Sequence, residues 1–183
     1  MNPIFLQTGG TGPLIAQSIG IIAVTISCVV FLGRKRKTIL LCKFTSDVLW
    51  FWHYFLIGAY SGAALNILAL FRETIFMNKE KKWASSKFWL YLILILTFIS
   101  CLMTWEGPAS LLPMIGSSCA VISFWCTKPV NIRLTAIPSQ ALWLVYGFIH
   151  FSLPSIICNT MGLITIGIGL YQDVQEMKKA EKE

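Results

Sequence analysis

Charged residues are scarce in this chain. They make up 13% of its 183 residues, whereas a soluble domain carries about 25%. A chain this short has too much surface to be kept soluble by so few charges. The apolar classes reach 56% and the mean hydropathy is +0.69. We therefore expect an integral membrane protein rather than a soluble domain.

Sequence motifs of enzymes and metal sites are missing as well. The six cysteines form no CxxC pair, so neither a zinc site nor a disulfide framework is expected. There is no HExxH, GxSxG or Walker-type loop, and no pair of aspartates on facing helices. We therefore expect no catalytic residue, no metal and no cofactor, and an intramembrane enzyme is the most distant alternative.

A basic N-terminal segment is also absent, because the first cationic residue is Arg34. A cleavable signal peptide needs such a segment, so none is expected. The net charge of +7 comes from short basic runs between apolar segments, where membrane loops carry them. Nucleic-acid binding is therefore not expected, and the lipid bilayer is the expected partner.

Long apolar segments stand in place of the missing charge. A membrane-spanning helix needs about 20 mainly apolar residues. Two of the apolar segments, 44–77 and 134–171, are too long for one helix and are interrupted near their middle by turn-forming residues. Seven helices are therefore expected, at 13–33, 44–59, 62–77, 88–104 and 109–126, with two more in 134–171 separated near Ser152 and Pro154.

The distribution of charge supports this count. With seven helices, all fifteen Lys and Arg residues lie on one side of the membrane, and Glu106 lies on the other. Loops rich in Lys and Arg stay in the cytoplasm, so we expect the N-terminus outside and the C-terminus inside. If 44–77 were one helix, the basic runs 34–37 and 79–82 would face opposite sides.

The two long apolar segments resemble each other at an offset of 93 residues, and an earlier pair matches at offset 96. The pairs are Leu49-Trp50 with Leu142-Trp143, Phe55 with Phe148, Asn66 with Asn159 and, at offset 96, Ile19-Gly20 with Ile115-Gly116. We expect an all-α membrane protein with two three-helix repeats, 14–77 and 109–174, and a linker helix at 88–104. One intervening helix gives both repeats the same orientation, within a single domain over 1–183.

Polar residues inside the apolar segments supply the candidate site, because a polar group in lipid usually faces protein or a watery cavity. A spacing of three residues places Asp47, Trp50 and His53 on one broad helix face. The same spacing recurs in the second repeat, and each repeat adds one Asn. The candidate substrate-binding residues are Asp47, Trp50, His53, Asn66, Gln140, Trp143, Tyr146 and Asn159.

Two interpretations of these residues are open. Indole rings stack on sugar or base rings, and amides donate and accept hydrogen bonds, which suits a cavity for a small polar solute. The alternative is structural, since Asn and Ser commonly join membrane helices through hydrogen bonds. Near one end of the helices, Asp47, Arg72 and Glu73 suit a local ion pair. His53 titrates near neutral pH, although a hydrogen-bonded packing role is the simpler interpretation.

With these residues in view, the sequence resembles the YgjV family of bacterial inner-membrane proteins. The order and spacing of many features, over about residues 14–172, carry the resemblance. These features are the segment 17–20, Phe31, the basic run 34–37, Trp50 with His53, Gly58-Ala59, Leu65-Asn66, Arg72, the segment 111–116 and Trp143. The resemblance implies a multi-pass protein of the bacterial inner (plasma) membrane.

A more distant similarity is to the SWEET sugar transporters and PQ-loop proteins, which share the 3+1+3 plan, as PnuC-type vitamin transporters share the seven helices. The segment 141–147, followed by Pro154, resembles the closing helices of a SWEET repeat. In that family the matching Asn residues line the sugar pocket, which implies a solute-binding role for Asn66 and Asn159. The Pro-Gln pair of a PQ-loop repeat is replaced by Phe31-Leu32 here, and around residues 124–125 in the second repeat.

Two hypotheses from different classes follow. The first is a SWEET-like passive carrier of a small polar solute such as a sugar or a nucleoside. The second, motivated by the missing prolines, is a non-transporting interaction or scaffold protein of the membrane. Solute identity, direction, ion coupling and assembly into a homo-oligomer are left open by the sequence.

Overall fold

A computed structural model describes residues 12–32, 36–78, 80–126 and 129–180 of the chain. These residues form seven α-helices: α1 (Gly12–Leu32), α2 (Arg36–Leu56), α3 (Tyr60–Met77), α4 (Phe88–Met103), α5 (Leu111–Trp125), α6 (Pro129–Ile149) and α7 (Leu153–Ala180). A short 3-10 helix, η2 (Pro108–Ser110), precedes α5. The expected all-α class and the seven helices are confirmed.

Three helices extend further than the sequence predicts. The helix α2 begins at Arg36 instead of residue 44, α6 begins at Pro129 instead of 134, and α7 continues to Ala180 instead of ending at 171. Arg133, which precedes the helix start expected at residue 134, therefore lies in α6. The physical reason is that Lys, Arg, Gln and Glu end an apolar segment but are good helix formers, so the helix continues beyond the apolar region.

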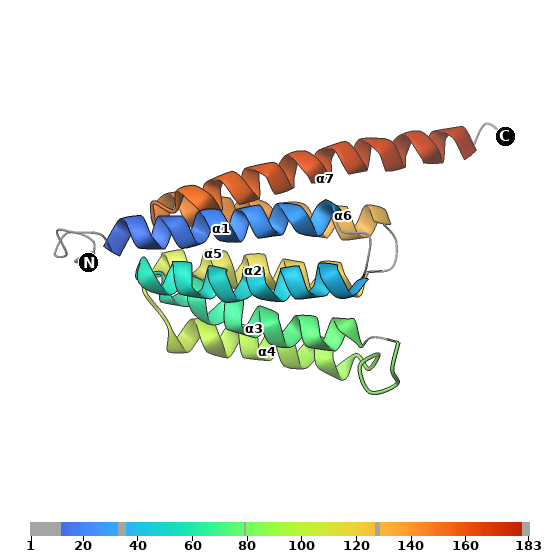
Figure 1. The fold of residues 1–183 in the computed structure, drawn as a ribbon. Coiled ribbons are helices and arrows are strands. Elements are labelled where there is room, and N and C mark those ends of the chain that lie inside the picture. Colours follow the sequence, from blue (N-terminus) through green and yellow to red (C-terminus); the bar gives the residue numbers. More distant parts are fainter. Residues whose placement is uncertain (1–11, 33–35, 79, 127–128, 181–183) are drawn as a thin grey trace.

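The helices run side by side and alternate in direction (Figure 1). The C-terminal ends of α1, α3, α5 and α7 lie together at one end of the bundle. We call it the basic end because Lys81, Lys82 and Lys178 lie there. The short turns α2–α3 and α6–α7, and the connection with Glu106, lie at the opposite end. Which end faces the cytoplasm stays a prediction.

Contacts between helices follow two sets of three. In the first set α1 packs on α2 and α2 on α3, and in the second set α5 packs on α6 and α6 on α7. The helix α4 contacts α3 and α5, while the sets also meet directly where α1 contacts α7 and α3 contacts α5. This grouping agrees with a 3+1+3 plan, and the descent of the two sets from one repeat stays a prediction.

The two short turns at the opposite end have the same backbone hydrogen bonds. After α2, the amides of Gly58 and Ala59 donate to carbonyls three and five residues earlier, at 3.1 and 2.9 Å. After α6, the amides of Phe151 and Ser152 do the same, at 3.2 and 2.9 Å. These are Schellman motifs with one left-handed residue each, Gly58 at φ 74° and Phe151 at φ 51°. The two positions differ by the sequence offset of 93.

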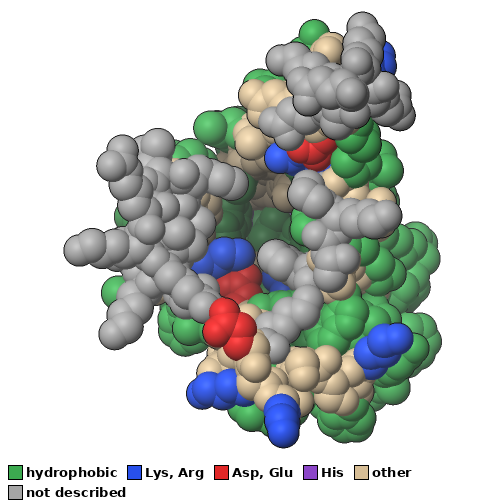
Figure 2. All heavy atoms as spheres, turned by 90° about the vertical axis from the view of Figure 1, so that its right-hand side faces the viewer, with side chains coloured by type: hydrophobic (Ala, Val, Ile, Leu, Met, Phe, Trp, Pro, Cys, Tyr) green, Lys and Arg blue, Asp and Glu red, His purple; other side chains and the backbone are tan. Residues whose placement is uncertain are grey.

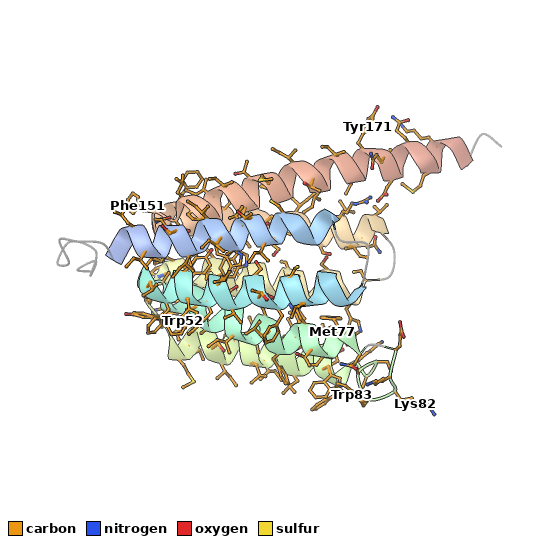
Figure 3. The ribbon with its side chains drawn as sticks, viewed as in Figure 1. Trp52, Met77, Lys82, Trp83, Phe151 and Tyr171 are labelled. Carbon is orange, nitrogen blue, oxygen red and sulfur yellow. The ribbon has the colours of Figure 1, made fainter. Side chains whose placement is uncertain are left out.

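The interior of the bundle contains many small polar side chains beside its aromatic core, and the surface carries many large apolar side chains. Serine supplies eight of the buried polar residues in the described part: Ser46, Ser61, Ser110, Ser117, Ser123, Ser139, Ser152 and Ser155. Large apolar side chains are exposed instead, and Figure 3 shows Trp52, Phe151 and Tyr171 pointing away from the bundle. Small residues let helices approach closely in lipid, where an exposed apolar surface has no cost.

Two described segments, Val130–Ile149 and Leu153–Gln175, are long and apolar enough to cross a bilayer by themselves. Three further apolar segments, Leu14–Cys28, Phe88–Met103 and Pro108–Ser123, are shorter. The helices α2 and α3 carry charged residues, such as Lys43 and Arg72, within their length. That all seven helices span the membrane therefore stays a prediction.

Candidate functional site

A cavity of about 450 Å³ lies inside the bundle, a volume in the range of sites for small molecules. Residues of α1, α2, α3, α5, α6 and α7 line it, and the described residues of α4 contribute none. The cavity therefore lies between the two three-helix sets. Figure 2 looks onto the basic end and shows a hollow between the helices, with Lys or Arg and Asp or Glu side chains beside it.

Most of the candidate residues meet in this cavity. Six of the eight line it: Asp47, Trp50, Asn66, Gln140, Trp143 and Asn159. His53 and Tyr146 are fully buried and lie outside the lining. The structure thus brings the paired Trp and Asn residues around one space, while their role in binding a solute stays a prediction.

Three aromatic rings form one wall of the cavity. Tyr54 stacks on Trp50, with ring centroids 5.8 Å apart, and lies 5.5 Å from Trp143 of the second set. Tyr54 therefore joins the two indoles into a continuous aromatic surface between the sets. The sequence analysis did not single out Tyr54, although it follows Trp50 by four residues and so lies on the same helix face.

The two Asn side chains have the same geometry at equivalent positions. The amide nitrogen of Asn66 donates to the Gly62 carbonyl at 2.8 Å, and that of Asn159 donates to the Ser155 carbonyl at 2.7 Å. These bonds to the preceding helical turn hold each amide in place. No hydrogen-bond donor to either Oδ1 atom is found in the described part of the chain, so both oxygens are available to a solute in the cavity.

Ion pairs stand at the basic end of the cavity. Lys43 Nζ lies 2.7 Å from Glu73 Oε1 and 3.4 Å from Asp47 Oδ1. Arg72 Nη2 lies 3.6 Å from the same Glu73 oxygen. The local ion pairing suggested for this group is confirmed, with Lys43 as its unforeseen centre. Two cations and two carboxylates balance one another, so this wall carries no net charge.

A second ion pair joins α6 to α7 at the basic end. Arg133 pairs with Asp173 and also donates from Nη1 to the Gly169 carbonyl at 2.7 Å. A Cβ atom at residue 169 would lie 2.6 Å from Arg133 Nε, so glycine makes room for the guanidinium there. Gly162 does the same for Gln140, whose Oε1 would lie 2.9 Å from a Cβ at residue 162.

The opposite end is held by neutral hydrogen bonds. His53 Nδ1 lies 2.8 Å from the Ala16 carbonyl, so this nitrogen carries the hydrogen and donates it. Its Nε2 atom, 2.6 Å from Ser152 Oγ, accepts from the serine hydroxyl. In this neutral form of the imidazole, both ring nitrogens are hydrogen-bonded. Tyr146 similarly accepts from the Gly62 amide at 3.1 Å.

The connection at Glu106 extends this bonded layer. Its Oε2 atom accepts from the Ser61 amide at 3.3 Å, at the first turn of α3, where a carboxylate suits the unpaired amides and the helix dipole. Nearby, burial lowers the pKa of His150 below its ordinary value, and the charge of Glu106 opposes that shift. His150 is therefore neutral at pH 7.

Comparison with known proteins decides the family. Residues 14–177 match the family model Imp-YgjV, a bacterial inner membrane protein family. The chain belongs to the YgjV family of bacterial inner membrane proteins. It is 26% identical over 134 residues to the inner membrane protein YgjV of Escherichia coli (strain K12), covering 73% of this chain and 70% of that protein. No solved structure matches it.

Membership of the YgjV family explains the surface of the bundle. A bacterial inner membrane surrounds such a protein with lipid, which accounts for the exposed apolar side chains and the serine-rich interior. The resemblance to this family is thus confirmed, together with the inner-membrane location. For a YgjV-family chain, this cavity offers room for a small ligand, with the polar side chains of Asn66, Gln140 and Asn159 in its lining.

Proposed function

We propose that this YgjV-family protein is a passive, SWEET-like carrier of a small polar solute, such as a sugar or a nucleoside. The observation that supports the proposal is the cavity, in which Trp50, Trp143, Asn66 and Asn159 meet from equivalent positions of the two sets. A ring-shaped solute would place one face on the aromatic wall. Its hydroxyl or amide groups would exchange water for the free Asn oxygens.

The two three-helix sets are proposed to be parallel repeats, as in PQ-loop proteins. The identical hydrogen bonds of the turns at Gly58 and Phe151, and of the two Asn amides, support this. Because Lys and Arg remain in the cytoplasm, the basic end would face inward and the N-terminus outward. The solute would cross unchanged, without enzyme chemistry or a cofactor.

The test is uptake by purified protein in liposomes, measured with labelled sugars, nucleosides and vitamins. At least one solute should enter, and the double variant Asn66→Leu with Asn159→Leu should reduce its rate at least tenfold. Asn131→Leu, which changes an exposed residue of α6 away from the cavity, is the matched control and should keep full uptake. Unchanged uptake by the double variant would remove these residues from the site.

The second candidate is a non-transporting interaction or scaffold protein. The hydrogen bonds that join the two sets, such as Tyr54 Oη to Ser155 Oγ at 2.7 Å, support it because they favour one rigid arrangement. Crosslinking in native membranes distinguishes the candidates. One stoichiometric partner together with no uptake of any tested solute would favour the scaffold, whereas recovery of the chain alone or as a homo-oligomer would weaken it.

A further inference from the structure

The cavity reaches only one end of the bundle. On α2 its lining runs from Lys43 to Tyr54, and on α6 it ends at Trp143. On α7 the lining begins at Cys158, five residues after the helix starts. Tyr146 on α6 and Ser155 on α7 lie beyond these levels and are fully buried, as is His53, one residue before Tyr54 on α2. The cavity is therefore open at the basic end and closed at the opposite end.

Hydrogen bonds between the two sets make this closure. His53 of α2 accepts from Ser152, the residue just before α7. Tyr146 of α6 accepts from the Gly62 amide in the first turn of α3. His53 and Tyr146 are equivalent at the offset of 93, so each set holds the start of the last helix of the other set. The pair Tyr54–Ser155 is a third bond across the same boundary.

The positions of these bonds allow them to break without unfolding a helix. The Gly62 amide is among the first amides of α3, which have no partner inside the helix. Ser152 Oγ also accepts from the Ser155 amide at 3.2 Å, and that helix cap is independent of His53. If the two sets separated here, water would replace each lost partner, so neither helix would lose a bond of its own.

Close packing at two glycines brings these groups together. A Cβ atom at residue 20 would lie 2.7 Å from His53 Nδ1 and 2.6 Å from Pro154 Cγ. A Cβ at residue 62 would lie 2.8 Å from Tyr146 Cε1. Alanine at either position would therefore push the groups of the closure apart. By contrast, a Cβ at residue 167 would meet nothing within 4 Å.

We propose that the bonds His53–Ser152, Tyr146–Gly62 and Tyr54–Ser155 form a gate, which closes the cavity at the opposite end and opens when the two sets separate there. The gate determines which face of the membrane has access to the cavity. It rests on the cavity and its closure and does not depend on the proposed carrier function, because access is measured without any solute.

Two native cysteines that line the cavity, Cys28 and Cys158, report access directly. The other four cysteines are replaced by Ala, and a membrane-impermeant sulfonated thiol reagent is added either to spheroplasts or to inverted inner-membrane vesicles. Lys82→Cys in a chain without other cysteines identifies the face of the basic end. With the gate intact, labelling from that face should be at least tenfold faster than from the other.

The gate variant is Ser152→Ala with Tyr146→Phe. It should raise labelling of Cys28 and Cys158 from the opposite face at least tenfold and leave labelling from the basic end unchanged, which shows that the chain is folded. Gly62→Ala should act in the same direction. Tyr91→Phe, on the exposed face of α4, and Gly167→Ala are the matched controls and should change neither rate.

Equal labelling of the parent chain from both faces would overturn the gate. So would gate variants that keep parental labelling from the basic end and gain none from the opposite face. If the double variant loses labelling from the basic end, the single variant Tyr146→Phe is used instead, because it keeps the ring and removes only the hydroxyl. Its labelling rates from the two faces are then compared with those of the parent chain in the same way. Failure of solute uptake with this labelling pattern intact would reject the carrier and leave the gate standing.

Discussion

The two ends of the bundle stabilise their buried polar side chains with different kinds of partner. At the opposite end, side chains without a formal charge pair, such as His53 and Tyr146, are fully buried and hydrogen-bonded to serine or backbone groups. At the basic end, charged groups such as Lys43 and Glu73 form ion pairs beside the open cavity. A buried neutral group needs one hydrogen bond, whereas a buried charge needs a counter-charge and further bonds. The ion pairs therefore lie beside the open cavity, and His53 and Tyr146 lie where the bundle is closed.

The largest loss of stability is expected for a variant that disrupts the closed end of the bundle. His53→Leu leaves the Ala16 carbonyl and the Ser152 hydroxyl without their partners. At about 0.5–1.5 kcal/mol for each hydrogen bond lost, the free energy of unfolding in detergent should fall by about 2 kcal/mol. Trp52→Leu, on the outward face of the same helix, is the control and should change it little. Equal losses for the two variants would contradict the bonded role of His53.

A smaller effect is expected at the basic end. Glu73→Gln removes the closest counter-charge of Lys43, 2.7 Å away, and leaves Asp47 as its partner. Because the Lys43 side chain is 37% exposed, the loss should be about 1 kcal/mol and should shrink as salt screens the pair. Unfolding measured at low and high salt checks this. An equal salt dependence for His53→Leu would remove the distinction between the ends.

The smallest expected effect concerns the two turns at the opposite end. Gly58→Ala places a side chain at φ 74°, which costs about 1 kcal/mol in the left-handed region. Phe151→Gly relieves the same strain at φ 51°, and glycine's own loss of backbone freedom reduces the gain to about 0.5 kcal/mol. Phe151 is 84% exposed, so little packing is lost. Thermal unfolding should therefore shift in opposite directions, and a shift in the same direction would argue against equivalent turns.

The number of helices and the shared side of the basic loops followed from the sequence because both depend on local composition. Apolar runs interrupted by Gly58 or Pro154 predict helices and turns without knowledge of the neighbours. Helix ends were less predictable, since α2 and α7 continue through charged residues. The role of Lys43 was not predicted for a related reason. A lysine near a helix end can reach solvent in many conformations, and only the packing of α3 on α2 brings Glu73 close to it.

By itself, the sequence determined that this protein needs lipid, predicted that its Lys and Arg residues gather at one end, and matched Trp and Asn residues at the offset of 93. Only the tertiary structure decided which of the polar residues face the cavity. A helix turns about 100° per residue. The six residues from Asp47 to His53 therefore leave His53 about 120° away from the face of Asp47, whereas the seven residues to Tyr54 leave it only about 20° away. Tyr54 therefore joins Asp47 at the cavity, and His53 turns away to close the opposite end.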